Sequence, residues 1–342
     1  MASQKDWDKV HEIKEKFCSA LLRNVHVNYV GVSLKKVAGQ STDTPTIVVA
    51  VKKKMPVSEL SDNEKIPAFL DGVPTDVIES DLNLVKLEDI PSQQQAVQPT
   101  AEKVGSVDPY AYSATVTSGM SMATYKAPLA NGTVGCFVTV TGDPKLTGIT
   151  VGGKYLVTCQ HVVASAPPSD RIIIPASKRE GKPPEKNDRA NYVNGRDSPE
   201  QSVDVAAVKL DDKVAFKNDI PTATSVTRAT GVLTGWPLPG TVVFKYGSTT
   251  WYTEGYVEAT NVSGGGYDDL MKINGKKKGT RSTVIADSGD SGSIIVISSN
   301  SNITGQLFAV NNDTKISGGY TQCYAYRMDK QLSTLAGNWK LS

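Results

Sequence analysis

The chain is short of cysteine and histidine. Of its 342 residues, only three are histidines and four are cysteines. The cysteines, Cys18, Cys136, Cys159 and Cys323, lie far apart and form no CxxC pair. This spacing argues against a zinc site and against a dense disulfide framework, so we expect four free thiols. We expect no metal and no organic cofactor.

Long apolar runs are also missing, and so is a strong charge imbalance. No stretch approaches the roughly 18 apolar residues that a membrane span needs, and the charged first residues lack the apolar core of a signal peptide. The net charge is only +2, and the lysine runs at 52–54 and 276–278 are short. Short runs of this kind are typical of solvated turns. We therefore expect neither a membrane nor a nucleic acid as partner.

What the sequence does contain favours β structure, with 29 glycines, 13 tyrosines and many β-branched residues. Residues 6–23 have the apolar spacing of an amphipathic helix, and two β-branched runs after them predict a hairpin. Residues 1–88 are thus expected to form a small α+β domain. Residues 89–118, rich in Gln, Pro, Ser and Gly, are expected to form a linker or covering segment. Residues 119–342 hold eleven short apolar runs between turn signals, which predicts one all-β domain, a barrel or sandwich.

The strongest local signal is ADSGDSGS at residues 286–293. A serine that attacks carbonyl groups must project from a tight turn, and glycines permit that turn. Ser291 is the candidate nucleophile, and the backbone N–H groups of Gly289 and Ser291 are candidate donors to an oxyanion. Asp290 is expected to hold the turn's conformation.

A serine hydroxyl needs a base, and the chain offers three histidines. His11 lies on the expected helix and His26 on the first strand, whereas His161 ends the apolar strand of GKYLVTCQHVVA. The third member must orient the imidazole, and Asp204 in QSVDVAAVKL has the near-buried setting for that role. Four other acids lie in polar stretches and are expected to be in solvated loops: Asp188, Asp197, Asp211 and Asp212. The predicted triad is His161, Asp204 and Ser291.

The motifs LVTCQHV, VDVAAVKL and GDSGS resemble the His, Asp and Ser signatures of the trypsin/chymotrypsin-like serine peptidase superfamily. NGTVGCFVTV, KYGSTTWYTEGYV and TGQLFAV are similar to an intracellular branch found in bacteria, fungi and plants, including the plant NARROW LEAF type. The resemblance implies a mainly β fold, a chymotrypsin-like double β-barrel preceded by the small α+β domain. It also implies a cytoplasmic serine endopeptidase that hydrolyses peptide bonds of an intracellular protein target through an acyl-enzyme.

The resemblance further implies a substrate pocket with Ile285 at its base and Phe308, Ala309 and Val310 along one wall. Because no acid stands at the base, an uncharged or apolar side chain is expected before the cleaved bond. Nothing resembles the activation site whose freed N-terminus pairs with the Asp before the Ser in digestive enzymes. Asp290 must therefore find another partner, or the small domain or a binding event assembles the turn.

The sequence is compatible with two alternative functions. An α/β-hydrolase esterase is disfavoured because residue 293 is Ser and because the triad partners precede the serine. The serious rival is a latent or partner-gated protease-fold module that binds or regulates and has little activity alone. The small domain and the linker are suited to covering a cleft. An activating partner protein and an oligomer both stay open, alongside a protein or peptide substrate.

Overall fold

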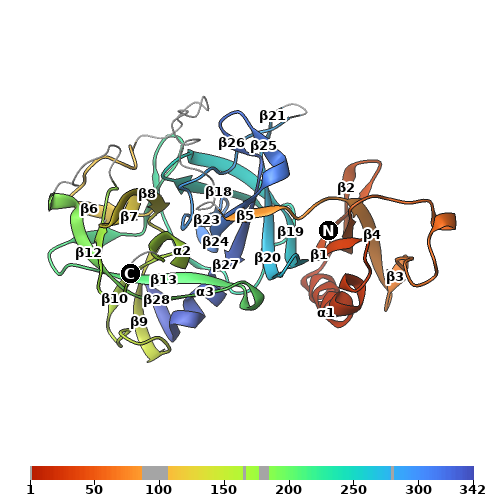
Figure 1. Ribbon diagram of the computed structural model, residues 1–342, viewed down its shortest axis with the longest axis horizontal. Coiled ribbons are helices and arrows are strands. Elements are labelled where there is room, and N and C mark those ends of the chain that lie inside the picture. Colours follow the sequence, from red (N-terminus) through yellow and green to blue (C-terminus); the bar gives the residue numbers. More distant parts are fainter. Residues whose placement is uncertain (1, 87–106, 165–166, 177–184, 279–280) are drawn as a thin grey trace.

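The computed structural model describes residues 2–86, 107–164, 167–176, 185–278 and 281–342 (Figure 1). These residues form mainly β-strands, with three α-helices: α1 (Gln4–Leu22), α2 (Gln160–Val163) and α3 (Met328–Leu335). Among the helices of these ranges, none is both long enough and apolar enough to cross a membrane.

The N-terminal unit is a helix packed on a small sheet, as the sequence predicts. Ser3 and Asp6 form a capping box at the start of α1, and the apolar face of the helix, including Trp7 and Val10, packs on the sheet. The sheet runs β1-β2-β4-β3, with β1–β2 and β3–β4 antiparallel and β2–β4 parallel. The bounds are β1 (Val27–Val37), β2 (Gln40–Val51), β3 (Phe69–Leu70) and β4 (Val73–Glu79), with a 3-10 turn at Val57–Glu59.

A first barrel follows from an eight-stranded sheet of order β28-β9-β10-β13-β12-β11-β7-β8. Its last strand, β8, continues directly into β9 through Val134 and Gly135. The bounds are β7 (Ser121–Thr124), β8 (Ala127–Thr133), β9 (Cys136–Pro144), β10 (Lys154–Thr158), β11 (Arg171–Ile173), β12 (Asp188–Ser198), β13 (Val203–Leu210) and β28 (Ala336–Leu341).

The second barrel has the strand order β18-β23-β24-β27-β20-β19 and is closed by pairing of β19 with β18. The mainly β, two-barrel architecture expected from the sequence is therefore confirmed. The bounds are β18 (Val242–Gly247), β19 (Trp251–Gly264), β20 (Tyr267–Gly275), β23 (Ile294–Ile297), β24 (Asn302–Asn311) and β27 (Gln322–Arg327).

Short strands complete the structure. One of them, β6, lies inside the segment 89–118 that was expected to be a linker, and it pairs with β14; residues 87–106 of that segment lie outside the described residues. The short strands are β5 (Leu84–Lys86), β6 (Thr115–Thr117), β14 (Ala215–Lys217), β15 (Asp219–Pro221), β16 (Val226–Arg228), β17 (Gly231–Val232), β21 (Lys277–Lys278), β22 (Arg281–Ser282), β25 (Lys315–Ile316) and β26 (Gly319–Tyr320).

The N-terminal unit is joined to the second barrel by a continuous sheet. β19 is long enough to pair with β18 through its first half and with β1 through its second half, so β1 and β19 lie side by side (Figure 1). Charged side chains, partly or fully buried, accompany this seam. Glu258 of β19 accepts from Lys36 of β1 at 2.8 Å, and Lys272 of β20 donates to the Tyr29 hydroxyl at 2.9 Å. Backbone pairing and ion pairs thus tie the two units together.

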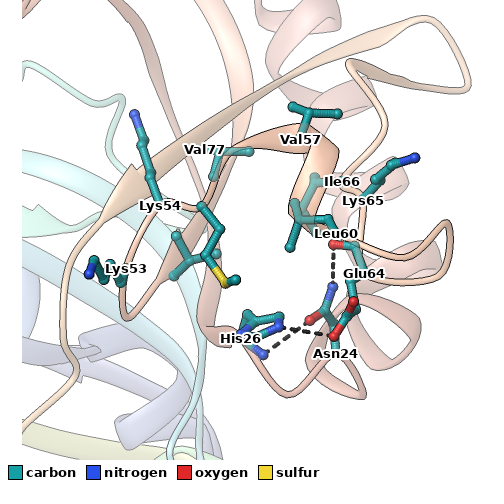
Figure 2. Close-up of a pocket in the computed structure, with 12 residues that line it drawn as sticks. Asn24, His26, Lys53, Lys54, Val57, Leu60, Glu64, Lys65, Ile66 and Val77 are labelled. Carbon is teal, nitrogen blue, oxygen red and sulfur yellow. Dashed lines mark hydrogen bonds and ion pairs between the residues drawn. The ribbon is translucent and has the colours of Figure 1, made fainter.

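The N-terminal unit also carries an open pocket of about 280 Å³ (Figure 2). Its polar rim includes His26, whose Nε2 lies 3.1 Å from a Glu64 carboxylate oxygen, and Asn24, which donates to the Glu64 carbonyl. The apolar lining includes Val57 and Ile66. The pocket belongs to the N-terminal unit and lies apart from the residues predicted to carry out chemistry.

The contribution of this seam to the stability of the protein should decrease at acid pH. Burial alone would raise the pKa of Glu258, but Lys272 and Lys36 hold it at about 2, below its usual 4.5. A lowered folded-state pKa gives stability that is fully present above pH 4.5 and is lost as the pH falls toward 2. We expect Glu258→Gln to cost on the order of 3 kcal/mol in the free energy of unfolding at pH 7.

Denaturant unfolding of both proteins between pH 7 and pH 2 measures this difference, which should shrink as the pH falls below 4.5. Glu59→Gln, at an exposed site of the N-terminal unit, serves as the matched control and should show no such convergence. A difference that stays constant across this range would contradict the prediction.

Candidate active site

His161 lies where the first barrel meets the second. β10 ends at Thr158, and the chain turns through Cys159 into α2, which places the imidazole at the end of the strand. The ring is buried. Its Nδ1 lies 2.5 Å from Asp204 Oδ2, and its Nε2 lies 2.6 Å from Ser291 Oγ. The structure therefore brings the three residues of the predicted triad into one hydrogen-bonded chain.

Asp204 is the second residue of β13 and is buried. Its Oδ1 accepts from the backbone N–H of His161 at 3.2 Å, so both carboxylate oxygens contact the same residue. Burial on its own would raise the pKa of Asp204, but the charge and the hydrogen bonds of His161 hold it below its ordinary value. The carboxylate is therefore ionised while it faces the imidazole.

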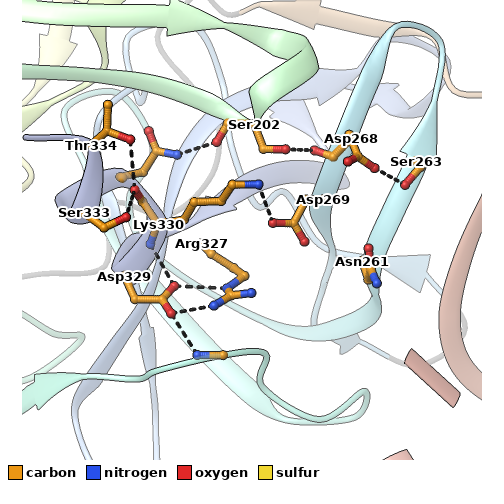
Figure 3. Close-up of polar contacts among 12 residues, drawn as sticks. Ser202, Asn261, Ser263, Asp268, Asp269, Arg327, Asp329, Lys330, Ser333 and Thr334 are labelled. Atoms are coloured by element: carbon orange, nitrogen blue, oxygen red, sulfur yellow. Dashed lines mark hydrogen bonds and ion pairs between the residues drawn. The ribbon is translucent and has the colours of Figure 1, made fainter. Parts of the chain in front are cut away.

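Helix α3 holds the backbone beside Asp204, and the sequence analysis missed this. Gln331 accepts from the Asp204 N–H at 2.9 Å and donates to the Ser202 carbonyl at 2.7 Å. Neighbouring side chains anchor the helix: Lys330 donates to Asp269 of β20 at 2.9 Å (Figure 3). No local pattern marks a helical glutamine as the partner of a strand more than a hundred residues earlier.

The turn that carries Ser291 depends on two glycines. Asp290 N–H donates to the Asp287 carbonyl at 3.1 Å, and Gly289 within this turn has φ +92°, which glycine adopts without strain. A Cβ on Gly292 would meet Thr158 Oγ1 at 2.2 Å. The Gly289 carbonyl accepts from two hydroxyls, Thr133 Oγ1 at 2.8 Å and Ser248 Oγ at 2.6 Å. The backbone of the turn is thereby fixed from both barrels.

Asp290 finds its partner inside the protein, in Lys245 of β18. The two side chains are fully buried, and Lys245 Nζ lies 2.9 Å from Asp290 Oδ2. Thr250 Oγ1 donates to the same oxygen at 2.6 Å, and the N–H groups of Thr249 and Thr250 donate to the other. The requirement for a partner is thus met by a lysine that the sequence analysis overlooked. Its signal was a charged residue inside the apolar strand VVFKYG, because a buried charge needs a partner.

Cys159, His161 and Asp204 place potential metal-ligating atoms within 4.8 Å of one another. Zinc and similar ions bind the thiolate. Burial raises the pKa of Cys159 well above its ordinary value, and its Sγ donates to the Leu307 carbonyl at 3.2 Å. The His161 nitrogens face Asp204 and Ser291. Cys159 therefore behaves as a buried, protonated thiol, and His161 and Asp204 are engaged in hydrogen bonds rather than arranged as metal ligands.

The four residues expected to form the substrate pocket fall into two apolar clusters. Ile285 and Val310 belong to the core of the second barrel, whereas Phe308 and Ala309 pack in another cluster that contains Cys159. All four side chains are buried. Their role in substrate recognition stays a prediction.

Comparisons with known proteins agree with this architecture. The chain matches the Trypsin family over residues 126–328. Among solved structures, Nocardiopsis protease has 16% identity and a TM-score of 0.45, with 66% of this chain and 98% of that chain covered. Thermobifida fusca protease A has 12% identity and a TM-score of 0.44, with 67% and 99% covered. A glutamic acid-specific serine protease has 18% identity and a TM-score of 0.46, with 66% and 100% covered. No curated protein matches the chain.

The family match spans more than half of the chain, and the two barrels lie within and just around it. The fold is that of a chymotrypsin-like protein from about residue 126 onward, preceded by a region with a helix and strands. The chain belongs to the trypsin family. The comparisons give no support for assigning it to the particular intracellular branch that the sequence resembles.

The buried pair supplies a test of how the turn is held. Lys245→Met should leave Asp290 as an uncompensated buried charge and lower the free energy of unfolding by about 3–5 kcal/mol. Lys209→Met, at an exposed position of β13, is the matched control and should change it little. Adding Asp290→Asn to Lys245→Met should recover part of the loss, because the mismatched charge is gone. Equal stability of the Lys245 and Lys209 variants would contradict the prediction.

Proposed function

We propose that the protein is a serine endopeptidase that uses His161, Asp204 and Ser291 as its catalytic triad. The observation that carries this proposal is the continuous chain from Asp204 Oδ2 through the imidazole to Ser291 Oγ, with separations of 2.5 and 2.6 Å. Nucleophile, base and orienting carboxylate stand in the order that acyl transfer needs. The trypsin family acts on proteins, and we propose a protein or peptide substrate here as well.

The protonation states follow from the contacts. An ionised Asp204 can only accept, so His161 Nδ1 carries the proton and Nε2 is left to accept from the Ser291 hydroxyl. As Ser291 Oγ bonds to the peptide carbonyl carbon, its proton passes to Nε2, and the imidazolium is stabilised by Asp204. The C–N bond then breaks, and the leaving amine takes that proton. Water releases the acyl group by the same route, with His161 again as base.

The carbonyl oxygen gains negative charge in this step and needs fixed donors. We propose the N–H groups of Gly289 and Ser291 for this role. Support comes from the turn, where the Gly289 carbonyl is tied to Thr133 and Ser248 and Asp290 is tied to Lys245. Donors whose backbone is held before the reaction need no reorganisation during it.

The primary specificity is proposed to be for an uncharged or apolar side chain before the cleaved bond. Ile285 and the wall residues Phe308, Ala309 and Val310 support this, because all are apolar and buried. The target is proposed to be an intracellular protein, on the strength of the resemblance to the intracellular branch.

The triad can be tested with a fluorophosphonate probe and with casein hydrolysis. Ser291→Ala and His161→Ala should each abolish labelling and lower kcat by at least about 10⁴-fold, because the nucleophile and its base act as a unit. Ser298→Ala, at an exposed serine after β23, should label as the wild type does. Labelling that persists in Ser291→Ala would refute the assignment.

The pocket can be tested with peptides that differ only at the residue before the cleaved bond. Leucine should give a kcat/KM roughly tenfold or more above lysine, because a buried ammonium without an acidic partner is costly. A mixture of such peptides, analysed by mass spectrometry, gives the ratio directly. Faster cleavage after lysine would contradict an apolar pocket.

A further inference from the structure

The edge of β24 beside the candidate site is already occupied by a strand of the same chain. β24 passes the Ser291 turn closely: Gly292 N–H donates to the Leu307 carbonyl, and Leu307 N–H donates to the Ser293 carbonyl, each at 2.9 Å. One edge of β24 is covered by β27, and the other is covered by β23 only as far as Gln306. Beyond Leu307, this second edge is free of β23 and faces the site.

β5 fills that edge. It pairs antiparallel with β24, with Lys86 opposite Ala309 and Val85 opposite Val310. A strand rises about 3.3 Å per residue, so Ala309 lies roughly 7 Å along β24 from Leu307. The last described residue of β5 is therefore about two residues short of the serine turn.

The side chains of β5 reach both apolar clusters that hold the expected pocket residues. Val85 packs on the cluster with Ile285, and Leu84 packs on the cluster with Phe308. Because successive side chains of a strand point to opposite faces, one strand can pack on both clusters. β5 therefore contacts the expected pocket region in two ways. Its backbone pairs with Ala309 and Val310, and its side chains pack on the two clusters that contain the pocket residues.

The third side chain, Lys86, reaches toward the triad. Its Nζ lies 2.5 Å from Asp197, and Asp197 stands opposite Asp204 where β12 pairs with β13. Both members of this ion pair are partly screened from solvent. Asp197 is exposed, as expected, and its ion pair with Lys86 also ties β5 to β12.

We propose that β5 is a tethered pseudosubstrate, a strand of the N-terminal unit that occupies the edge of β24 on which an extended peptide must lie to present its carbonyl to Ser291. The N-terminal unit then inhibits the site within the same molecule, and this inference rests on the proposed function. Main-chain pairing at a sheet edge is a general mode of peptide binding. A tether raises the effective concentration of the occupant, so a weak strand can compete with a free substrate.

The first experiment measures occupancy without catalysis. A fluorescent synthetic peptide with the sequence of residues 80–92 is titrated into the full chain carrying Ser291→Ala. Val85→Pro is added to free the edge, because proline removes an N–H from the strand. Val57→Pro is the matched control, at the first position of a 3-10 turn that tolerates proline.

The peptide should bind at least about tenfold more tightly to the Val85→Pro protein than to the Val57→Pro protein, since apparent affinity scales with the fraction of free sites. Fluorescence anisotropy gives both Kd values, and circular dichroism checks that both variants are folded. Equal Kd values for the two folded variants overturn the proposal.

A second experiment keeps Ser291 and measures casein hydrolysis. Lys86→Glu places a negative charge beside Asp197, and Lys53→Glu, an exposed lysine of the same unit, is its control. Lys86→Glu should raise kcat/KM at least about tenfold over Lys53→Glu. Equal hydrolysis by two variants that both label with fluorophosphonate overturns the pseudosubstrate and leaves the protease standing. Failure of every variant to label, with tighter peptide binding to Val85→Pro, overturns the protease and leaves the occupied edge standing.

Discussion

The ion pair between Lys245 and Asp290 is the interaction on which the candidate site depends most. Two opposite charges with no exposure to solvent lie 2.9 Å apart, and the Asp290 carboxylate also accepts from Asp287 of the turn and from Thr249 and Thr250, just before β19. Such a pair adds little net stability compared with apolar residues, but the loss of one partner is costly. Its value lies in geometry, because the carboxylate can satisfy all its donors only when the turn around Ser291 has one conformation.

That conformation matters because the site is assembled from two barrels. His161 and Asp204 come from the first, and Ser291 comes from the second. A shared apolar cluster joins the barrels, with Val157 and Val205 from one packing with Phe244 and Ile294 from the other. Polar contacts across the same boundary, such as that of Thr133 with Gly289, set the position of the turn. Close packing leaves little freedom for the barrels to shift, so the short contacts of the imidazole are built into the fold.

The N-terminal unit is part of this arrangement through two separate attachments. The first is the seam of β1 with β19, where backbone pairing is reinforced by the ion pair of Glu258 with Lys36. The second is β5, which is short and lies at the sheet edge beside the site. A long, buried seam and a three-residue strand differ greatly in the free energy needed to open them. The unit can therefore stay anchored while β5 leaves its edge, which suits a strand that has to give way to a substrate.

The sequence by itself determined the fold class, the N-terminal helix and hairpin, and the triad candidates. These features rest on local information: the period of apolar residues, the glycines that a tight turn requires, and the scarcity of histidine, which left His161 as the candidate base. Only the tertiary structure decided what surrounds those residues. Three contacts join positions that are remote in sequence: the ion pair of Lys245 with Asp290, the hydrogen bond of Gln331 with the Asp204 backbone, and the pairing of β5 with β24. Periodicity and motifs report which face of a strand is buried, whereas the partner across a sheet edge or a barrel boundary is set by how whole elements pack.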